Sequence, residues 1–271
     1  MKILPKFVVV VFCTLAVGPF LWHLVSSFKD AAEVTQVPPT FLPARPTLEN
    51  YHGLFERRPF LRYSLNSFII AALASVLCIA SASLAAYRLA RAEPRVRETF
   101  TSVLLGLAFF PPIVFLFPLY EMIRALSLVN HPWGLILPYA TLNLPLSIWL
   151  LTGYFRNIPI ELEEAAQMDG LSSLQTFVTI VLPLAAPALV TAAILAFVSS
   201  WNEYMLALTF MNADDARTVT VAVATLSGAF VYQIPWGLIA AGVITSSLPL
   251  IVLTIVFQKK IVSGLTAGSS R

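Results

Sequence analysis

A short acidic stretch, Glu164-Ala165-Ala166-Gln167-Met168-Asp169-Gly170, stands between two long apolar parts of the chain. Ten residues after the glycine comes Ile180-Val181-Leu182-Pro183. Polar helices of a hydrophobic chain must lie outside the lipid, where they can meet another protein. There the Glu164 carboxylate is available to a basic partner, and the small Ala165 and Ala166 side chains permit close contact.

The same stretch predicts two short helices joined by a turn. Pro159 is tolerated near a helix start, and the acids that follow it suit the positive end of the helix dipole. Gly170 allows the left-handed backbone conformation that ends a helix. We expect a second helix from Ser172 to about Val181, ending before Pro183.

A second polar cluster, Trp201-Asn202-Glu203-Tyr204, lies within an apolar stretch. A carboxylate at membrane depth is costly and usually faces a bundle interior or a water-filled cavity. Asn202 and Tyr204 add polar groups, and Trp201 offers a flat face suited to a sugar ring. Two interpretations stay open: Glu203 lines a solute path, or it bonds structurally to a neighbouring helix or subunit.

The sequence motifs of common catalytic sites are missing from the chain. It contains no G-x-x-x-x-G-K-[ST] phosphate loop, no H-E-x-x-H zinc motif and no G-x-S-x-G elbow. We therefore expect no catalytic residue, no metal site and no cofactor in this chain.

Composition places these clusters in a membrane protein. Of 271 residues, 58% are hydrophobic and 11% are charged, against about 25% charged in a typical soluble domain. The net charge of +3 and the lack of a basic stripe argue against a nucleic-acid partner. The fold class expected is an all-α membrane protein with six transmembrane helices, at residues 7–26, 68–90, 100–122, 133–154, 188–210 and 236–257. A cleaved signal peptide is a weaker alternative for the first.

The basic residues predict that both termini lie inside the cell. Arg88, Arg91, Arg95 and Arg97 follow the second span, and lysines flank the first and last spans. Residues 156–187 then lie inside, and the loops 27–67 and 211–235 lie outside. Any helix in the proline-punctuated part of loop 27–67 should be short. Prolines in spans three and four predict kinks. The two cysteines, Cys13 and Cys78, are expected to be reduced and buried in helices.

The E-A-A-x3-G-x9-I-x-L-P pattern resembles the one in permease subunits of ABC importers, of the carbohydrate (maltose or trehalose) type. The resemblance covers nearly the whole chain and implies a single permease domain, residues 1–271, with the type I importer fold. It implies that residues 156–187, here named the coupling segment, dock on a separate ATPase dimer that holds the ATP and magnesium. The matching residues are Glu164, Ala165, Ala166, Asp169, Gly170, Ile180, Leu182 and Pro183.

Other implied partners are a homologous second permease subunit, an extracytoplasmic sugar-binding protein, membrane lipid and a small sugar. In permeases of this type, a W-N-[DE] pattern in the fifth span resembles residues 201–203. The outer loop would contact the binding protein through Gly228, Phe230 and Tyr232, and the tail would contact the ATPase through Gly264, Leu265 and Thr266. The implied function is ATP-driven sugar import by alternating access across a bacterial or archaeal cell membrane. The alternative is a proton-coupled secondary transporter that uses Glu203 as its relay.

Overall fold

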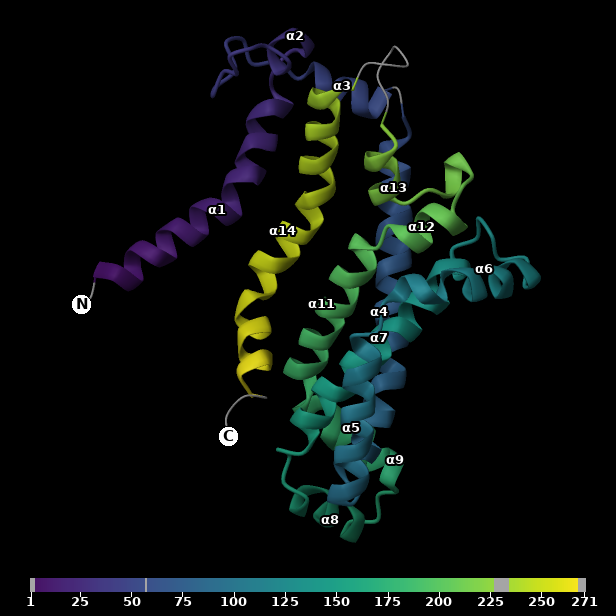
Figure 1. Cartoon of the computed structure of the whole chain (residues 1–271). Coiled ribbons are helices and arrows are strands. Elements are labelled where there is room, and N and C mark those ends of the chain that lie inside the picture. Colours follow the sequence, from purple (N-terminus) through teal and green to yellow (C-terminus); the bar gives the residue numbers. More distant parts are fainter. Residues whose placement is uncertain (1–2, 57, 227–233, 268–271) are drawn as a thin grey trace. The chain divides into compact units, whose positions relative to one another are not determined.

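The computed structural model describes residues 3–56, 58–226 and 234–267, and this part of the chain is helical without any strand (Figure 1). The chain divides into two compact units. The first unit comprises residues 1–65 and 217–251, and the second comprises residues 66–216 and 252–271. Two long helices, α4 (Phe60–Ala90) and α14 (Trp236–Ala267), each continue from the first unit into the second.

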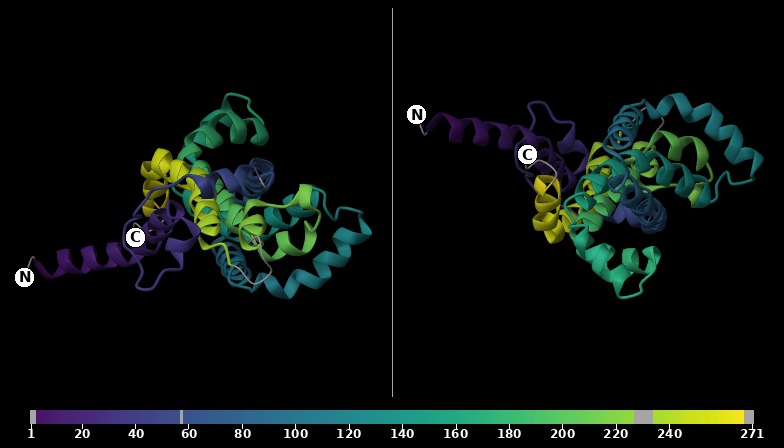
Figure 2. Two further views of the ribbon diagram at one scale, coloured as in Figure 1. Left: turned by 90° about the horizontal axis from the view of Figure 1, so that it is seen from above. Right: turned by 90° about the horizontal axis from the view of Figure 1, so that it is seen from below.

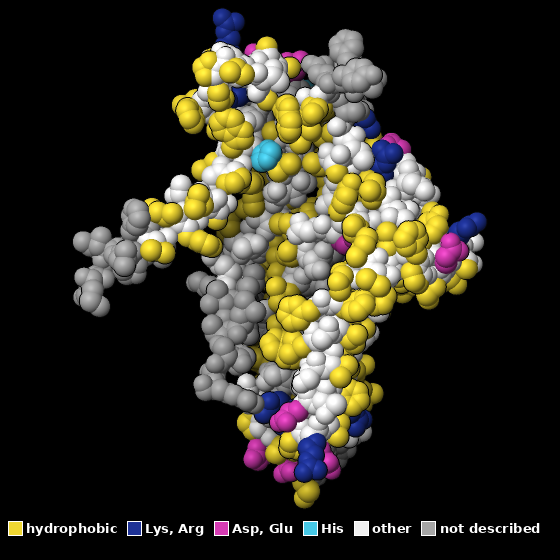
Figure 3. All heavy atoms as spheres, viewed as in Figure 1, with side chains coloured by type: hydrophobic (Ala, Val, Ile, Leu, Met, Phe, Trp, Pro, Cys, Tyr) yellow, Lys and Arg dark blue, Asp and Glu magenta, His cyan; other side chains and the backbone are white. Residues whose placement is uncertain are grey.

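Within the described residues, four helices are long and apolar enough to cross a membrane by themselves: α1 (Ile3–Ser27), α4, α7 (Trp133–Phe155) and α14. Two further spans are possible if each of two sharply bent helix pairs counts as one, which gives up to six. Large apolar side chains are exposed along these helices, and Figure 3 shows hydrophobic side chains over much of the visible surface. Such a surface fits a lipid solvent.

The third predicted span is bent rather than continuous. Helix α5 (Pro94–Ala108) ends early, and a 3₁₀ turn, η1 (Pro112–Phe115), leads into α6 (Leu116–Ala125) at an angle of 82° (Figures 1 and 2). Consecutive prolines at 111 and 112 remove two backbone donors, so the helix cannot continue through them. The sequence predicted a kink here, and residues 100–122 belong to two helices joined by a sharp bend rather than to one straight helix.

The fifth predicted span, residues 188–210, is also interrupted. Helix α11 (Ala186–Asn202) ends at Glu203, which has an extended backbone, and α12 (Met205–Phe210) begins two residues later. The other spans differ mainly in length: α4 starts eight residues before the predicted position 68, and α14 continues to Ala267. Cys13 is exposed on α1, contrary to the expected burial, whereas Cys78 is buried on α4, and both are free thiols.

In the first unit, the segment after α1 forms only short helices, as predicted: α2 (Ala31–Val34) and α3 (Glu49–Glu56). It nevertheless buries two charged side chains. Lys29, 2% exposed, donates to the Thr40 carbonyl and lies 4.9 Å from the Trp22 ring centroid. Glu33 accepts from the Thr40 hydroxyl at 2.7 Å and from the Ala44 amide at 3.0 Å. Buried charges are tolerated when they are bonded in this way.

Asn50 on α3 closes this segment and sets its distance from α14. Its side-chain nitrogen donates to the carbonyls of Ser27, at 3.0 Å, and Lys29, at 2.8 Å. A Cβ atom at Gly237 would lie 2.6 Å from the Asn50 side-chain oxygen, so only glycine permits this close approach at the start of α14. The remaining helix of this unit is α13 (Val219–Ala224).

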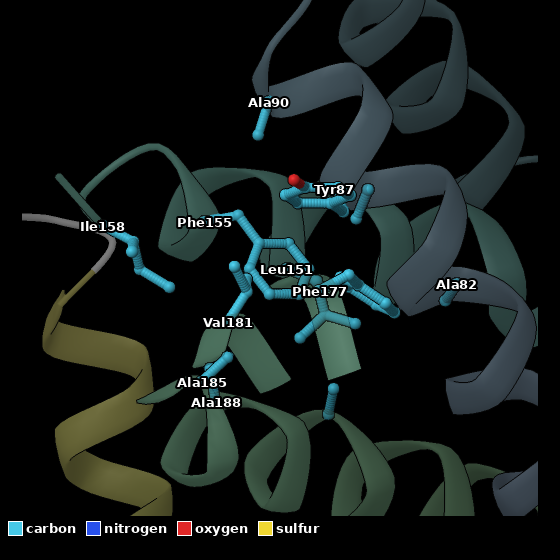
Figure 4. Close-up of a cluster of buried hydrophobic side chains, with 12 residues drawn as sticks. Ala82, Tyr87, Ala90, Leu151, Phe155, Ile158, Phe177, Val181, Ala185 and Ala188 are labelled. Carbon is cyan, nitrogen blue, oxygen red and sulfur yellow. The ribbon is translucent and has the colours of Figure 1, made fainter. Parts of the chain in front are cut away.

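The second unit has a buried core where α4 and α7 meet the end of the coupling segment (Figure 4). The Tyr87 ring packs against Phe177, with centroids 4.8 Å apart, and against Phe155 at 6.1 Å. Small alanines complete the cluster and let the helix backbones approach closely. Its buried members are Ala82, Ala86, Tyr87, Ala90, Leu151, Phe155, Ile158, Phe177, Val181, Ala185, Ala188 and Ala192.

Candidate functional site

The first half of the coupling segment ends in a turn that requires glycine. Helix α8 (Glu161–Met168) stops before Gly170, whose φ of 89° is left-handed, as the sequence predicted. The Gly170 amide donates to the Gln167 carbonyl, and the Leu171 amide donates to the Ala166 carbonyl, both at 3.0 Å. These two bonds form a Schellman motif, which satisfies the free carbonyls at the helix end.

The second half is longer than predicted. Helix α9 (Ser173–Thr176) begins with a capping box, in which Ser172 and Gln175 each bond to the other's backbone amide. A π-helical turn, η2 (Phe177–Val181), and α10 (Leu182–Leu184) follow directly. The prediction that helix ends before Pro183 was therefore wrong: a proline in the first turn of α10 loses no hydrogen bond. The chain then bends by 78° into α11.

The predicted contact residues of this segment separate into two groups. Glu164, Ala165, Asp169 and Pro183 are exposed, whereas Ala166 is only 4% exposed and Ile180 and Leu182 are partly buried. Two exposed apolar side chains were missing from the predicted set: Met168, 88% exposed, and Leu174, 65% exposed. The sequence could have indicated them, because they are apolar residues on either side of the turn at Gly170.

The coupling segment protrudes from its own unit. Figure 1 shows α8 and α9 beside the end of α4, and Figure 2 shows this part of the chain (teal to green) standing out to one side. Figure 3 shows acidic and basic side chains gathered at this end of the unit. Glu163 differs from its neighbours because it is only 5% exposed and binds Tyr87 on α4 and Arg91 directly after that helix. The coupling segment therefore exposes charged and apolar side chains around Gly170, while Glu163 fixes α8 to the rest of the unit.

The second unit also has an open cavity of about 550 Å³. The lining residues from α5, η1 and α6 are apolar, whereas the polar side chains come from α7, from α11 and from the break after α11. The lining residues are Ala108, Pro112, Ile113, Leu116, Tyr139, Leu142, Asn143, Leu146, Ser199, Ser200, Glu203, Tyr204, Met205 and Leu206. A mostly apolar hollow with a few convergent polar groups is typical of a small-molecule site.

Glu203 lies in this cavity wall and stabilises the helix break. One carboxylate oxygen accepts from the Tyr139 hydroxyl at 2.5 Å and from the Ala207 amide at 3.1 Å. The other accepts from the Leu206 amide at 2.8 Å. The side chain thus caps the first turn of α12 and joins it to α7, so both interpretations of Glu203 keep support.

The neighbours of Glu203 do not all reach the cavity. Tyr204 lines it, but Trp201 is 3% exposed and stacks on Phe197 with centroids 5.7 Å apart, so its face is not available to a ring. The exposed Asn202 donates to the Val198 carbonyl at 2.9 Å and is absent from the lining.

Four polar lining residues escaped the sequence analysis: Tyr139, Asn143, Ser199 and Ser200. Asn143 donates to the Tyr139 carbonyl at 2.8 Å and to the Ser200 hydroxyl at 3.3 Å. Their signal was weak: Asn143 is an amide in an otherwise apolar span, close to Pro145.

The remaining predicted contact residues lie in two other segments of the chain. Gly228, Phe230 and Tyr232 lie outside the described residues. Gly264, Leu265 and Thr266 lie in the last turns of α14. Among the residues that the structure describes, no group of three or more His, Cys, Asp or Glu side chains could hold a metal ion.

Comparison with known proteins points to one transport family. Residues 79–266 match the family model described as "Binding-protein-dependent transport system inner membrane component". The chain is 41% identical over 258 residues to the trehalose/maltose transport system permease protein MalG of Thermococcus litoralis, covering 93% of this chain and 90% of that protein. It is 40% identical over 250 residues to the sulfoquinovosyl glycerol transport system permease protein SmoH of Agrobacterium fabrum, covering 92% and 87%.

A solved structure agrees with these sequence matches. The fold superimposes with a TM-score of 0.81 on a chain of a bacterial ABC transporter involved in the import of the acidic polysaccharide alginate. The two chains are 25% identical, and the match covers 95% of each.

Proposed function

Since the chain belongs to the family of binding-protein-dependent transport system inner membrane components, we propose that it moves a carbohydrate as the permease subunit of an ATP-driven ABC importer. It is a multi-pass membrane protein and not itself an enzyme. The observation that carries the proposal is the protruding coupling segment, with its E-A-A pattern and left-handed Gly170, in a chain whose relatives transport sugars.

The proposed topology has six spans in one permease domain of type I fold, with both termini inside the cell. Each bent helix pair then counts as one span. The arginines after α4 support placing the coupling segment in the cytoplasm.

This topology predicts one-sided labelling. In a chain with Cys13 and Cys78 replaced by alanine, Asp169→Cys should react with a membrane-impermeant maleimide only after the cells are permeabilised. Gln36→Cys, an exposed residue of the loop after α1, is the matched control and should react in intact cells. Labelling of Asp169→Cys in intact cells would reverse the topology.

The coupling segment docks, in this proposal, on a cytoplasmic ATPase dimer that binds the ATP and magnesium. Glu164, Ala165, Met168, Asp169 and Leu174 form the exposed tip, and the α14 residues 264–266 add a second contact. The buried or partly buried residues of the motif hold the tip in place from within. ATP binding displaces the tip, and the attached helices convert that displacement into alternating access.

The cavity of the second unit is the proposed sugar path. Tyr139, Asn143, Ser200, Glu203 and Tyr204 supply donors and acceptors for sugar hydroxyls, while the α5–α6 wall is apolar. Trp201 serves in packing rather than in sugar contact. A homologous second permease subunit would complete the path, and an extracytoplasmic binding protein would deliver a di- or oligosaccharide to the outer loop at residues 228–232.

The proton-coupled alternative has little support. The relatives are ABC transport permeases, and the Glu203 carboxylate is held by the Tyr139 hydroxyl and two backbone amides. A relay would have to break these bonds in each cycle.

The test is sugar uptake by the complete transporter in proteoliposomes containing its binding protein. Uptake of radiolabelled trehalose or maltose should require ATP and magnesium on the ATPase side. Collapse of the proton gradient with an ionophore should leave the rate unchanged. Uptake driven by the gradient without ATP would contradict the proposal.

A further inference from the structure

A buried ion pair connects the coupling segment to a helix from a distant part of the chain. Glu163 on α8 is 5% exposed, although the neighbouring Glu161 and Glu164 are exposed. Its partners lie four residues apart: Tyr87 is on the last turn of α4, and Arg91 is the first residue after that helix. A carboxylate is buried at the base of a polar loop only if its charge is compensated there.

Both oxygens of the Glu163 carboxylate are bonded. The Tyr87 hydroxyl donates to Oε2 at 2.6 Å, and the Arg91 Nε donates to Oε1 at 3.0 Å. The Arg91 Nη2 donates to the same Oε1 and also, at 3.1 Å, to the carbonyl of Ile158. Arg91 is therefore hydrogen-bonded both to α8 and to the loop that precedes it.

The cluster is anchored on the core side. The Tyr87 ring packs against both Phe155 and Phe177, which also contact each other (Figure 4). This packing holds the ring in place independently of the hydrogen bond that its hydroxyl donates to Glu163. The coupling segment is joined covalently to α7 and to α11, but α4 lies about 70 residues earlier in the sequence. Motion of α8 can reach α4 through this cluster because its bonds are directional and short.

We propose that Tyr87, Arg91 and Glu163 are positioning residues that make α4 move with the coupling segment, so that ATPase closure is converted into helix movement. The inference rests on the proposed function. It assigns different roles to adjacent acids: Glu164 faces the ATPase, and Glu163 holds the segment to the permease core.

The experiment compares Glu163→Gln and Tyr87→Phe with the control Glu161→Gln in the complete transporter. Glu161 is an exposed acid of the same helical turn with no assigned contact role. Three quantities are measured: ATPase retained on co-purification, ATP hydrolysis, and radiolabelled trehalose or maltose transported per ATP. Tyr87→Phe keeps the ring in the core, so it decides the outcome if Glu163→Gln fails to assemble.

We expect both variants to retain the ATPase and to hydrolyse ATP. Sugar transported per ATP should fall about tenfold in Glu163→Gln and about threefold in Tyr87→Phe, with no change in Glu161→Gln. A fold-supporting role alone would lower the amount of transporter without changing this ratio. An unchanged ratio in both variants overturns the inference.

Loss of ATPase binding in proportion to transport also overturns it, because Glu163 would then act in docking. If the unsubstituted chain retains no ATPase at all, the proposed function fails together with the inference. That result is distinguishable, since it appears before any substitution is made.

The distance between two spin labels tests directly whether the cluster of Tyr87, Arg91 and Glu163 holds α8 to α4. Leu84→Cys on α4 and Gln167→Cys on α8 replace exposed side chains outside the proposed docking tip, in a chain with Cys13 and Cys78 replaced by alanine. The distance between them should keep one narrow distribution with and without ATP. Adding Tyr87→Phe should broaden this distance distribution. An unchanged distribution would contradict the proposal that the cluster holds α8 to α4.

Discussion

Replacing Gly170 by valine should abolish sugar uptake while the chain still inserts into the membrane. The φ of 89° is the reason, because a β-branched residue in the left-handed region costs about 1–2 kcal/mol and loses the Schellman geometry. Space is not the cause, since nothing lies within 4 Å of a Cβ atom at this position. The tip residues on either side of the turn would no longer match one partner surface, so ATPase binding should weaken at least about tenfold.

Gly153→Val is the matched control for this prediction. Gly153 lies on α7 near the coupling segment, also has open space around its Cβ position, and is not among the positive-φ glycines. It should bind the ATPase and transport normally. Uptake is measured in membranes with equal amounts of inserted protein, together with co-purified ATPase. Wild-type uptake by Gly170→Val would show that the turn is not required.

The second large effect is expected at Glu203. Removing the side chain in Glu203→Ala leaves the Tyr139 hydroxyl and the Leu206 and Ala207 amides without this acceptor. Each buried donor left unbonded costs about 1–3 kcal/mol. The alanine variant should therefore lose both assembly and uptake.

Glu203→Gln separates structure from solute passage. The amide keeps an oxygen acceptor but no charge, so assembly should survive while uptake falls about tenfold. Glu121→Gln is the control, because Glu121 is a largely exposed acid on α6. Uptake should be measured over a range of sugar concentrations with ATP hydrolysis in parallel. Wild-type rates in both Glu203 variants would remove Glu203 from the path, and failure of both to assemble would leave it a structural role alone.

Sequence reasoning predicted best what depends on a few adjacent residues. The left-handed turn at Gly170 follows from the residue type and its position after α8, and the structure confirms it. The helical class and most long helices follow from apolar length alone. The short helices of the loop after α1 follow from its prolines.

What sequence reasoning missed depends on partners far along the chain. Nothing local distinguishes Glu163 from Glu164: the first is buried because Tyr87 and Arg91 stand opposite it, 76 and 72 positions away. The helix break at Glu203 likewise uses Tyr139, 64 positions earlier. Apolar content cannot show that a span bends, because both halves of a bent pair remain apolar.

The segment after α1 has a consequence for the order in which the protein is made. The hydrogen bonds that bury Lys29 and Glu33 and tie Asn50 to Ser27 join residues at most 23 positions apart, and the Ser27–Tyr51 bond spans 24. Contacts so close in sequence form early, because little loop entropy is lost. The segment can close once residue 51 has been synthesised, before α4 exists. It is then a folded segment between the first two long helices, and the rest of the chain is inserted after it has folded.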